Sequence, residues 1–304
     1  MKLAAYLIMA LVEEPLSSRT AQRRYPACYL VPNNVAAMLR ILLPTDFSSN
    51  AMHAANYALQ LFGKSEATYI LMHAQHDPAY VDEMGYSMVP ELLEAAEDRL
   101  VVRAEHFAKT TGAIVESHLL FGILDVVVEE FVSEQGADVV VMGKRGRTGS
   151  ALFGSNTADV IRSSSVPVVA VPDKASLDPL HRILLAADQN EVAPANFALL
   201  RTIALRHQAE VLVTHVEMDV PAGAAHWSEG LYELALQDVP LTFLEGFGHD
   251  IADGLERTAN ESKAGMIAIL HRHLGSFDRL FHRSLAKEMA LGTELPLLVL
   301  QQKA

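Results

Sequence analysis

The chain lacks the features that mark several common protein classes. Its 304 residues hold a single cysteine, Cys28, which excludes an internal disulfide framework and a cysteine metal cage and points to a reducing compartment. Positive charge is not in excess: the net charge is −13, so wholesale binding to nucleic acid or to an anionic membrane is not expected. Neither a Walker A motif nor G-x-G-x-x-G occurs, and no Ser/His/Asp set or pair of carboxylates in a triad-like context stands out.

Long hydrophobic runs are also missing. The apolar run from Leu3 to Val12, which follows Lys2, is short for a membrane span, and no clear A-x-A cleavage site follows it. The run faintly resembles a secretory signal. We favour instead a disordered extension over residues 1–37, or a start placed too early, with Met38 as the true first residue. No membrane contact is expected.

From residue 39 onward, short apolar runs alternate with helical patterns. Ser48 and Ser49 can cap a helix that runs to about Leu61, and Ser-Asn-Thr at 155–157 can cap a helix over 158–163. Strands separated by helices predict βαβ units, in which a parallel sheet carries helices on both faces. The expected strands are 40–43, 68–73, 113–120, 138–142 and 166–171, and the expected helices are 49–61, 89–110, 123–134 and 158–163.

The chain then repeats itself, with the same landmarks in the same order. Residues 41–46 return as 183–188, 137–142 as 264–269, and 166–168 as 295–297. Half of the residues are apolar, as expected for a globular protein with a full core. The repeat predicts two α/β domains of one kind, over 38–173 and 180–302, joined near residues 172–179.

The sequence from about Met38 to the C-terminus resembles a tandem member of the universal stress protein family. The residues that carry the resemblance are Pro44-Thr45-Asp46, Ala137-Asp138, Val139 to Gly143, Gly146, Gly154-Ser155 and Val166-Pro167-Val168. The resemblance implies two tandem Rossmann-like domains of the adenine nucleotide alpha hydrolase-like type, each with a five-stranded parallel sheet. It also implies an ATP site, with Mg²⁺, at the carboxyl edge of the first sheet, where open α/β sheets bind ligands in general.

The resemblance implies a role for each residue that matches the motif. Pro44, Thr45 and Asp46 would approach the adenine or ribose, and Met142 and Gly143 would offer backbone contacts to the ribose. Phosphates would be held through Gly146, Gly154, Ser155 and Asn156, with charge-assisted bonds from the basic residues Lys144, Arg145 and Arg147. Two alternatives stay open: Asp46 can be a turn residue, and the basic cluster can be an ordinary solvated loop. Only seven residues, 147–153, separate Gly146 from Gly154, two fewer than is usual in ATP-binding members.

The second domain does not repeat the site. Aligned on the repeat, Gly143 becomes Leu270, Gly146 becomes His273 and Gly154-Ser155 becomes His282-Arg283, although Asp188 matches Asp46. Side chains then occupy positions where a backbone would have to approach a phosphate, so we expect no nucleotide in this half. His271, His273 and His282 lack a usual zinc spacing and are interpreted as part of a polar loop. His73 and His215 are expected to share one structural position.

These observations favour a cytoplasmic stress-response protein that binds an adenine nucleotide in its first domain and acts as a sensor or regulator. The resemblance implies that the last strands, 166–171 and 295–300, pair across the domains and form an intramolecular pseudo-dimer. It leaves open whether two chains also associate as a homodimer. Two other functions stay open: a slow ATP hydrolase, and an interaction module whose shortened loop binds no nucleotide.

Overall fold

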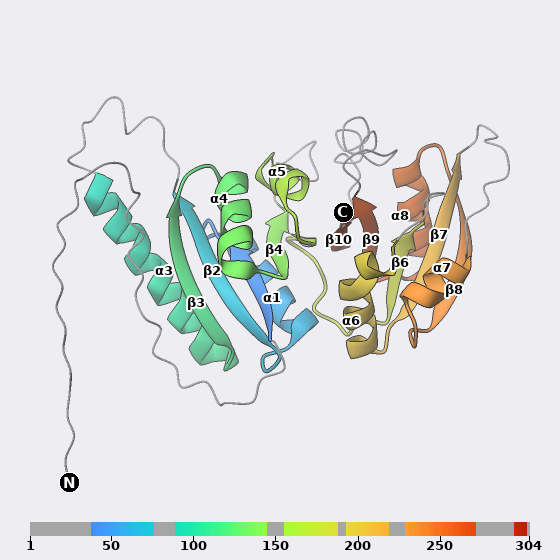
Figure 1. Ribbon diagram of the computed structural model, residues 1–304, viewed down its shortest axis with the longest axis horizontal. Coiled ribbons are helices and arrows are strands. Elements are labelled where there is room, and N and C mark those ends of the chain that lie inside the picture. Colours follow the sequence, from blue (N-terminus) through green and yellow to red (C-terminus); the bar gives the residue numbers. More distant parts are fainter. Residues whose placement is uncertain are drawn as a thin grey trace, which may run out of the picture. The chain divides into compact units, whose positions relative to one another are not determined.

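The computed structural model describes residues 38–75, 89–144, 155–187, 193–218, 229–271 and 295–302 (Figure 1). The predicted N-terminal extension, residues 1–37, lies outside these ranges. Strands and helices alternate along both halves of the described chain, as the sequence pattern predicts.

The first half contains five strands. Its elements are β1 (Leu39–Pro44), α1 (Ser49–Phe62), β2 (Ala67–Gln75), α3 (Val89–Thr111), β3 (Ile114–Phe121), α4 (Leu124–Phe131), a π-helical turn (Val132–Gly136), β4 (Val139–Lys144), α5 (Ser155–Ser163) and β5 (Val168–Pro172). Ser48 is the N-cap of α1, as predicted, and its hydroxyl accepts a hydrogen bond from the Ala51 amide at 3.2 Å.

The second half repeats this order. Its elements are β6 (Arg182–Ala186), a 3₁₀ turn (Pro194–Phe197), α6 (Ala198–His207), β7 (Glu210–Met218), α7 (Glu229–Ala235), β8 (Leu241–Gly248), α8 (Ile251–Ser262), β9 (Met266–His271) and β10 (Leu297–Gln301). Equivalent hydrogen bonds confirm the internal alignment. The Thr45 amide donates to the Met72 carbonyl at 2.8 Å, and the Ala187 amide donates to the Thr214 carbonyl at 2.7 Å. The next residues on β2 and β7 are His73 and His215, which therefore share one position.

The ten strands form one sheet in the order β3-β2-β1-β4-β5-β10-β9-β6-β7-β8. Each half contributes five parallel strands, and β5 pairs with β10 antiparallel, so the predicted pairing of the last strands is confirmed. Both strands begin two residues later than expected, after Pro167 and Pro296. Proline has no N–H to donate to a ladder, but the two proline carbonyls accept from the amides of Val140 (2.9 Å) and Ile267 (3.0 Å).

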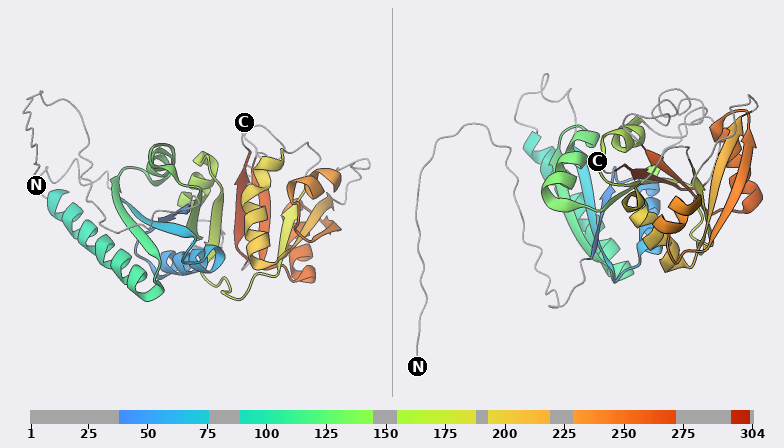
Figure 2. Two further views of the ribbon diagram at one scale, coloured as in Figure 1. Left: turned by 60° about the horizontal axis from the view of Figure 1, so that its bottom comes forward. Right: turned by 45° about the vertical axis from the view of Figure 1, so that its right-hand side comes forward.

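Apolar side chains alternate between the two faces of the sheet and build a core on each. On one face α1, α3, α6 and α7 pack against strand residues such as Ile41 and Val141. On the other face α4, α5 and α8 pack against residues such as Leu42 and Val140. Figure 2 shows the helices on both sides of the strands. This is the arrangement expected where a parallel sheet is buried on both faces.

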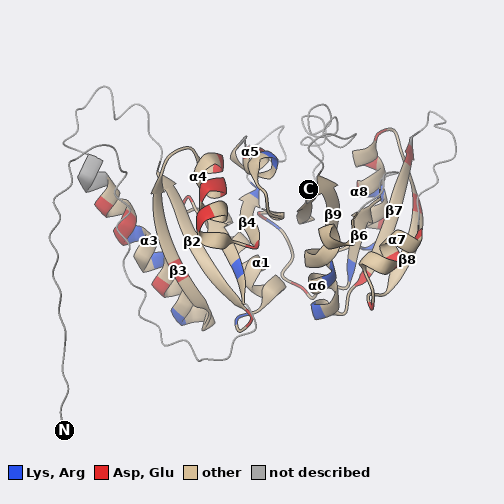
Figure 3. Cartoon of the chain, viewed as in Figure 1, with Lys and Arg blue, Asp and Glu red and all other residues tan. Residues whose placement is uncertain are grey.

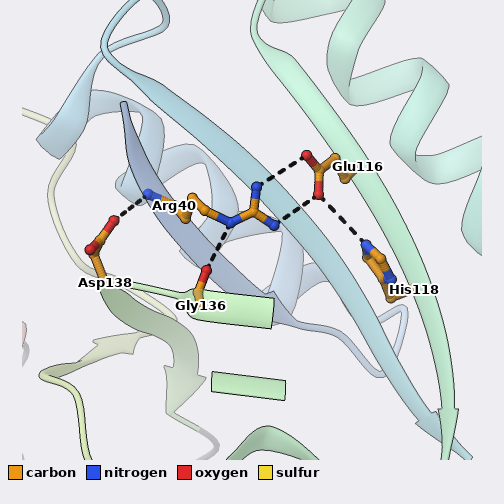
Figure 4. Close-up of polar contacts among 5 residues, drawn as sticks. All are labelled: Arg40, Glu116, His118, Gly136 and Asp138. Atoms are coloured by element: carbon orange, nitrogen blue, oxygen red, sulfur yellow. Dashed lines mark hydrogen bonds and ion pairs between the residues drawn. The ribbon is translucent and has the colours of Figure 1, made fainter. Parts of the chain in front are cut away.

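A charged network ties β1 to β3 across the intervening β2 (Figure 4). The Arg40 guanidinium donates to both carboxylate oxygens of Glu116, at 3.3 and 3.1 Å, and to the Gly136 carbonyl at 2.8 Å. The Arg40 amide donates to the Asp138 carboxylate at 2.7 Å. Hydrogen bonds from His118 and then Arg40 lower the pKa of Glu116, against the opposing effect of partial burial. The carboxylate form of Glu116 is therefore the one that the fold stabilises.

Candidate functional site

The carboxyl ends of β1 and β4 lie side by side at one edge of the sheet. The two strands are parallel neighbours, with Ile41 opposite Val139. Pro44 is buried at the end of β1, and Thr45 and Asp46 follow it. Met142 and Gly143 lie near the end of β4. The structure thus brings two groups of predicted site residues to the same sheet edge.

Asp46 takes part in the turn that leads into α1. Its Oδ1 accepts a hydrogen bond from the Ser48 amide at 3.0 Å, and the Thr45 hydroxyl accepts one from the Phe47 amide at 3.0 Å. Asp46 is therefore a turn residue, which is one of the two interpretations that the sequence left open. Asp46 is also exposed, so its carboxylate remains at the surface of this edge.

Phe47, which the sequence did not single out, has a strained backbone at this edge. Its φ is 64°, a conformation that costs a bulky L-residue on the order of 1–2 kcal/mol. The ring lies 4.4 Å from the His73 ring, and the Arg99 guanidinium carbon lies 4.4 Å from the Phe47 ring centroid. His73 Nδ1 also makes a 2.7 Å hydrogen bond with the Thr45 carbonyl. These contacts hold the turn after β1 in place.

Gly143 is the point where α1, β4 and α5 meet. A Cβ at this position would lie 2.7 Å from Asn50 Nδ2 and 3.0 Å from the Asn50 carbonyl oxygen, so α1 leaves no room for a side chain. The Gly143 carbonyl accepts a hydrogen bond from the Thr157 hydroxyl at 3.3 Å. The first turn of α5 is therefore anchored to the end of β4.

The predicted cap of α5 is wrong, because the helix begins at Ser155 rather than near Ala158. Ser155, Asn156 and Thr157 form its first turn. Thr157 is buried, and its hydroxyl donates to the Gly143 carbonyl instead of capping a helix that begins at Ala158. Asn156 is exposed. Since the first backbone N–H groups of a helix have no acceptor within the helix, those of α5 can bind an anion beside Gly143.

Lys144 does not lie in a solvated loop, as the sequence allowed, but is the last residue of β4. Only 6% of it is exposed, and it lies on the same face of the strand as Met142. Burial lowers the pKa of its ammonium group to about 8, and the nearby negative charges of Asp173 and Glu256 oppose this effect. Glu256 belongs to α8, so this lysine of the first half interacts electrostatically with the second half.

The remaining predicted site residues, Arg145, Gly146, Arg147 and Gly154, lie outside the described residues, as does the side chain of Ser155. Their roles stay predictions.

The equivalent edge of the second half is filled by side chains. Leu270 takes the place of Gly143 and is 3% exposed. His271 takes the place of Lys144 and is buried in β9, so its interpretation as a polar loop residue was wrong. Asp188, His273, His282 and Arg283 lie outside the described residues.

Within the described ranges, no three His, Cys, Asp or Glu side chains come together in a way that could hold a metal ion. No helix in this part of the chain is long and apolar enough to cross a membrane.

Known universal stress proteins are among the relatives of this chain. Residues 38–172 match the universal stress protein family. The chain is 25% identical over 147 residues to Universal stress protein MJ0531 of Methanocaldococcus jannaschii, which covers 47% of this chain and 86% of that protein. It is 41% identical over 81 residues to Universal stress protein G of Escherichia coli O157:H7, which covers 26% of this chain and 56% of that protein.

A solved structure shares the fold of both halves. The crystal structure of a universal stress protein from Archaeoglobus fulgidus DSM 4304 superimposes with a TM-score of 0.66 at 20% identity. The match covers 86% of this chain and 96% of that one. It supports the two Rossmann-like halves as an architecture.

Proposed function

Because residues 38–172 belong to the universal stress protein family, we propose that the first half binds an adenine nucleotide at the carboxyl ends of β1 and β4. ATP, bound with Mg²⁺, is the ligand that the resemblance favours. Mg²⁺ is held mostly by phosphate oxygens and water, so the site needs no dedicated set of protein ligands.

The observation that carries the proposal is the contact between Thr157 and Gly143. It fixes the N-terminus of α5 against Gly143, the residue before the end of β4, which has no side chain. The first N–H groups of α5, which have no acceptor within the helix, and the helix dipole favour a phosphate there. The exposed carboxylate of Asp46 follows the neighbouring strand β1, where it can accept hydrogen bonds from ribose or adenine. Adenine and phosphates thus have separate places along one sheet edge.

Binding would be confined to one half. Leu270 stands at the position equivalent to Gly143, so this half has a buried side chain where the first half has bare backbone. We therefore assign residues 38–173 to a nucleotide-binding domain and 180–302 to a domain that completes the fold. In this proposal the protein is a cytoplasmic sensor or regulator in a stress response, and two chains can associate further as a homodimer.

Calorimetric titration of ATP with Mg²⁺ tests the site. We expect saturable binding of one nucleotide per wild-type chain, and loss of the heat in Gly146→Trp, because an indole would block the predicted phosphate loop. His273→Trp, at the equivalent position of the repeat, is the matched control and should bind as the wild type does. Equal heats in Gly146→Trp and wild type, or no heat in wild type, would refute the proposal.

Hydrolysis of labelled ATP by the same preparation separates a binder from an enzyme. We expect no turnover above the rate without protein. Turnover that disappears in Gly146→Trp but persists in His273→Trp would instead assign the site to a slow hydrolase.

A further inference from the structure

Three large apolar side chains are exposed together where β3 turns into α4. Phe121 ends the strand and is 50% exposed, Ile123 precedes the helix and is 55% exposed, and Val126 lies in the first turn and is 49% exposed. They fall within six consecutive residues where β3 turns into α4, and we call them together the β3–α4 patch. Exposed apolar clusters of this kind mark interaction sites more often than isolated apolar residues do.

The repeat shows that the fold does not require this patch. The equivalent residues before and within α8 are Gly248, Asp250 and Asp253, none of which is apolar. Asp250 is the N-cap of α8, and its carboxylate accepts a hydrogen bond from the Asp253 amide at 2.9 Å. Ile123 stands at the N-cap of α4 and makes no side-chain cap. The first half therefore replaces a stabilising helix start with exposed apolar surface.

Acidic residues border the patch. Residues 123–136 include Asp125, Glu129, Glu130 and Glu134 but no lysine or arginine. Figure 3 shows this concentration of negative charge on α4. In a helix, Glu129 and Glu130 follow Val126 by three and four residues, so they share its side of α4. The surface thus combines an apolar centre with a negative margin.

We propose that the β3–α4 patch docks a basic amphipathic segment of a partner protein. Apolar side chains of that segment would cover Phe121, Ile123 and Val126, while its lysines or arginines would face the carboxylates of α4. Charge decides against two other occupants. A second copy that met this patch with its own patch would bring the same acidic margin against its like, and an anionic membrane would be repelled by a protein of net charge −13. The proposal does not depend on nucleotide binding.

The test uses a defined probe: a fluorescein-labelled two-heptad helix of leucine and lysine, with glutamate in place of lysine in the control peptide. Fluorescence anisotropy with the full chain should show saturable binding of the lysine peptide and none of the glutamate peptide. Ile123→Asp should weaken binding about fivefold or more, because it removes apolar contact area. The new carboxylate would by itself attract the peptide, so charge alone predicts the opposite result.

Leu234→Asp is the matched control, since Leu234 is 64% exposed on α7, away from the patch. It makes the same change of charge and polarity, and it should leave affinity unchanged. Ile123→Asp restores the cap that Asp250 provides in the repeat, so its thermal midpoint should not fall and lost binding would not reflect unfolding. Equal weakening by both substitutions, unchanged or tighter binding in Ile123→Asp, or no binding by wild type would overturn the proposal.

Discussion

Replacement of Lys144 by methionine would remove a buried amine while keeping the length and most of the volume of the side chain. In the folded protein, burial lowers the pKa of this amine from 10.5 to about 8, although Asp173 and Glu256 pull it upward. The protonated lysine therefore costs the folded state free energy that it does not cost the unfolded state. Methionine carries no such cost at any pH.

The sign of the effect follows from proton linkage. Between about pH 8 and pH 10.5 the unfolded chain binds more protons at this site than the folded chain, so wild-type stability should rise with pH in that range. The difference between the two pKa values corresponds to about 3 kcal/mol. This cost is fully present below about pH 8 and relieved above about pH 10.5. The free energy of unfolding of Lys144→Met, relative to that of wild type, should therefore be about 3 kcal/mol higher at neutral pH than at high pH. Any difference in packing between lysine and methionine should be the same at every pH.

Urea denaturation of both proteins at about pH 7, 9 and 10.5 measures this change, because the titration of all other groups cancels in the difference. Lys109→Met is the control: the Lys109 side chain is 76% exposed and pairs with Glu105 one helical turn away. Because this side chain is exposed, its replacement should change the free energy of unfolding only slightly. If the difference between Lys144→Met and wild type stays constant from neutral to high pH, or grows with pH, the argument from burial is wrong.

Three further substitutions probe other parts of the fold. Gly143→Ala should destabilise by about 1–3 kcal/mol in thermal unfolding, because its Cβ would overlap the first turn of α1, whereas Gly230→Ala meets nothing within 4 Å and should cause no loss. Glu116→Gln should cost about 1 kcal/mol at neutral pH. Because the folded pKa of Glu116 is lowered, this difference should disappear as acid denaturation curves pass below that pKa, and a difference that persists in acid would contradict the reasoning. Ile123→Asp should raise stability by about 1 kcal/mol by restoring the cap found at Asp250, and a lower thermal midpoint would refute this.

Much of the fold follows from local signals in the sequence. Ser48 predicts the start of α1 because its hydroxyl can satisfy an amide of the first turn, and it does so. The repeat predicts ten strands in two sets, and the family resemblance implies that the last strand of each set pairs with the other, as β5 and β10 do. The predicted strand ends are less accurate. The apolar runs begin at Val166 and Leu295, but the strands begin only after Pro167 and Pro296, because proline has no N–H to donate to the ladder.

The site was harder to predict because its geometry depends on residues distant in the chain. Ser155-Asn156-Thr157 has the composition of a cap, but the contact of Thr157 with Gly143 places these residues inside the helix. Lys144 follows a glycine and precedes Arg145 and Gly146, so the sequence leaves open both a contact with phosphate and an ordinary solvated loop. Lys144 stands two residues after Met142, and this spacing indicates that both side chains lie on one face of the strand. The electrostatic effect of Glu256 could not be predicted, because it depends on how the second half packs.

The two halves share one fold but carry different residues at two equivalent positions. Leu270 and Asp250 in the second half follow ordinary rules of stability: one fills space and the other caps a helix. Gly143 and Ile123 at the equivalent places in the first half forgo those gains. Departures from local stability tend to fall at functional sites. The second half also supplies β10, which pairs with β5 and so covers an apolar strand that would otherwise be an exposed edge. Both proposed sites therefore lie in the first half, and the second half contributes the strand that pairs with β5.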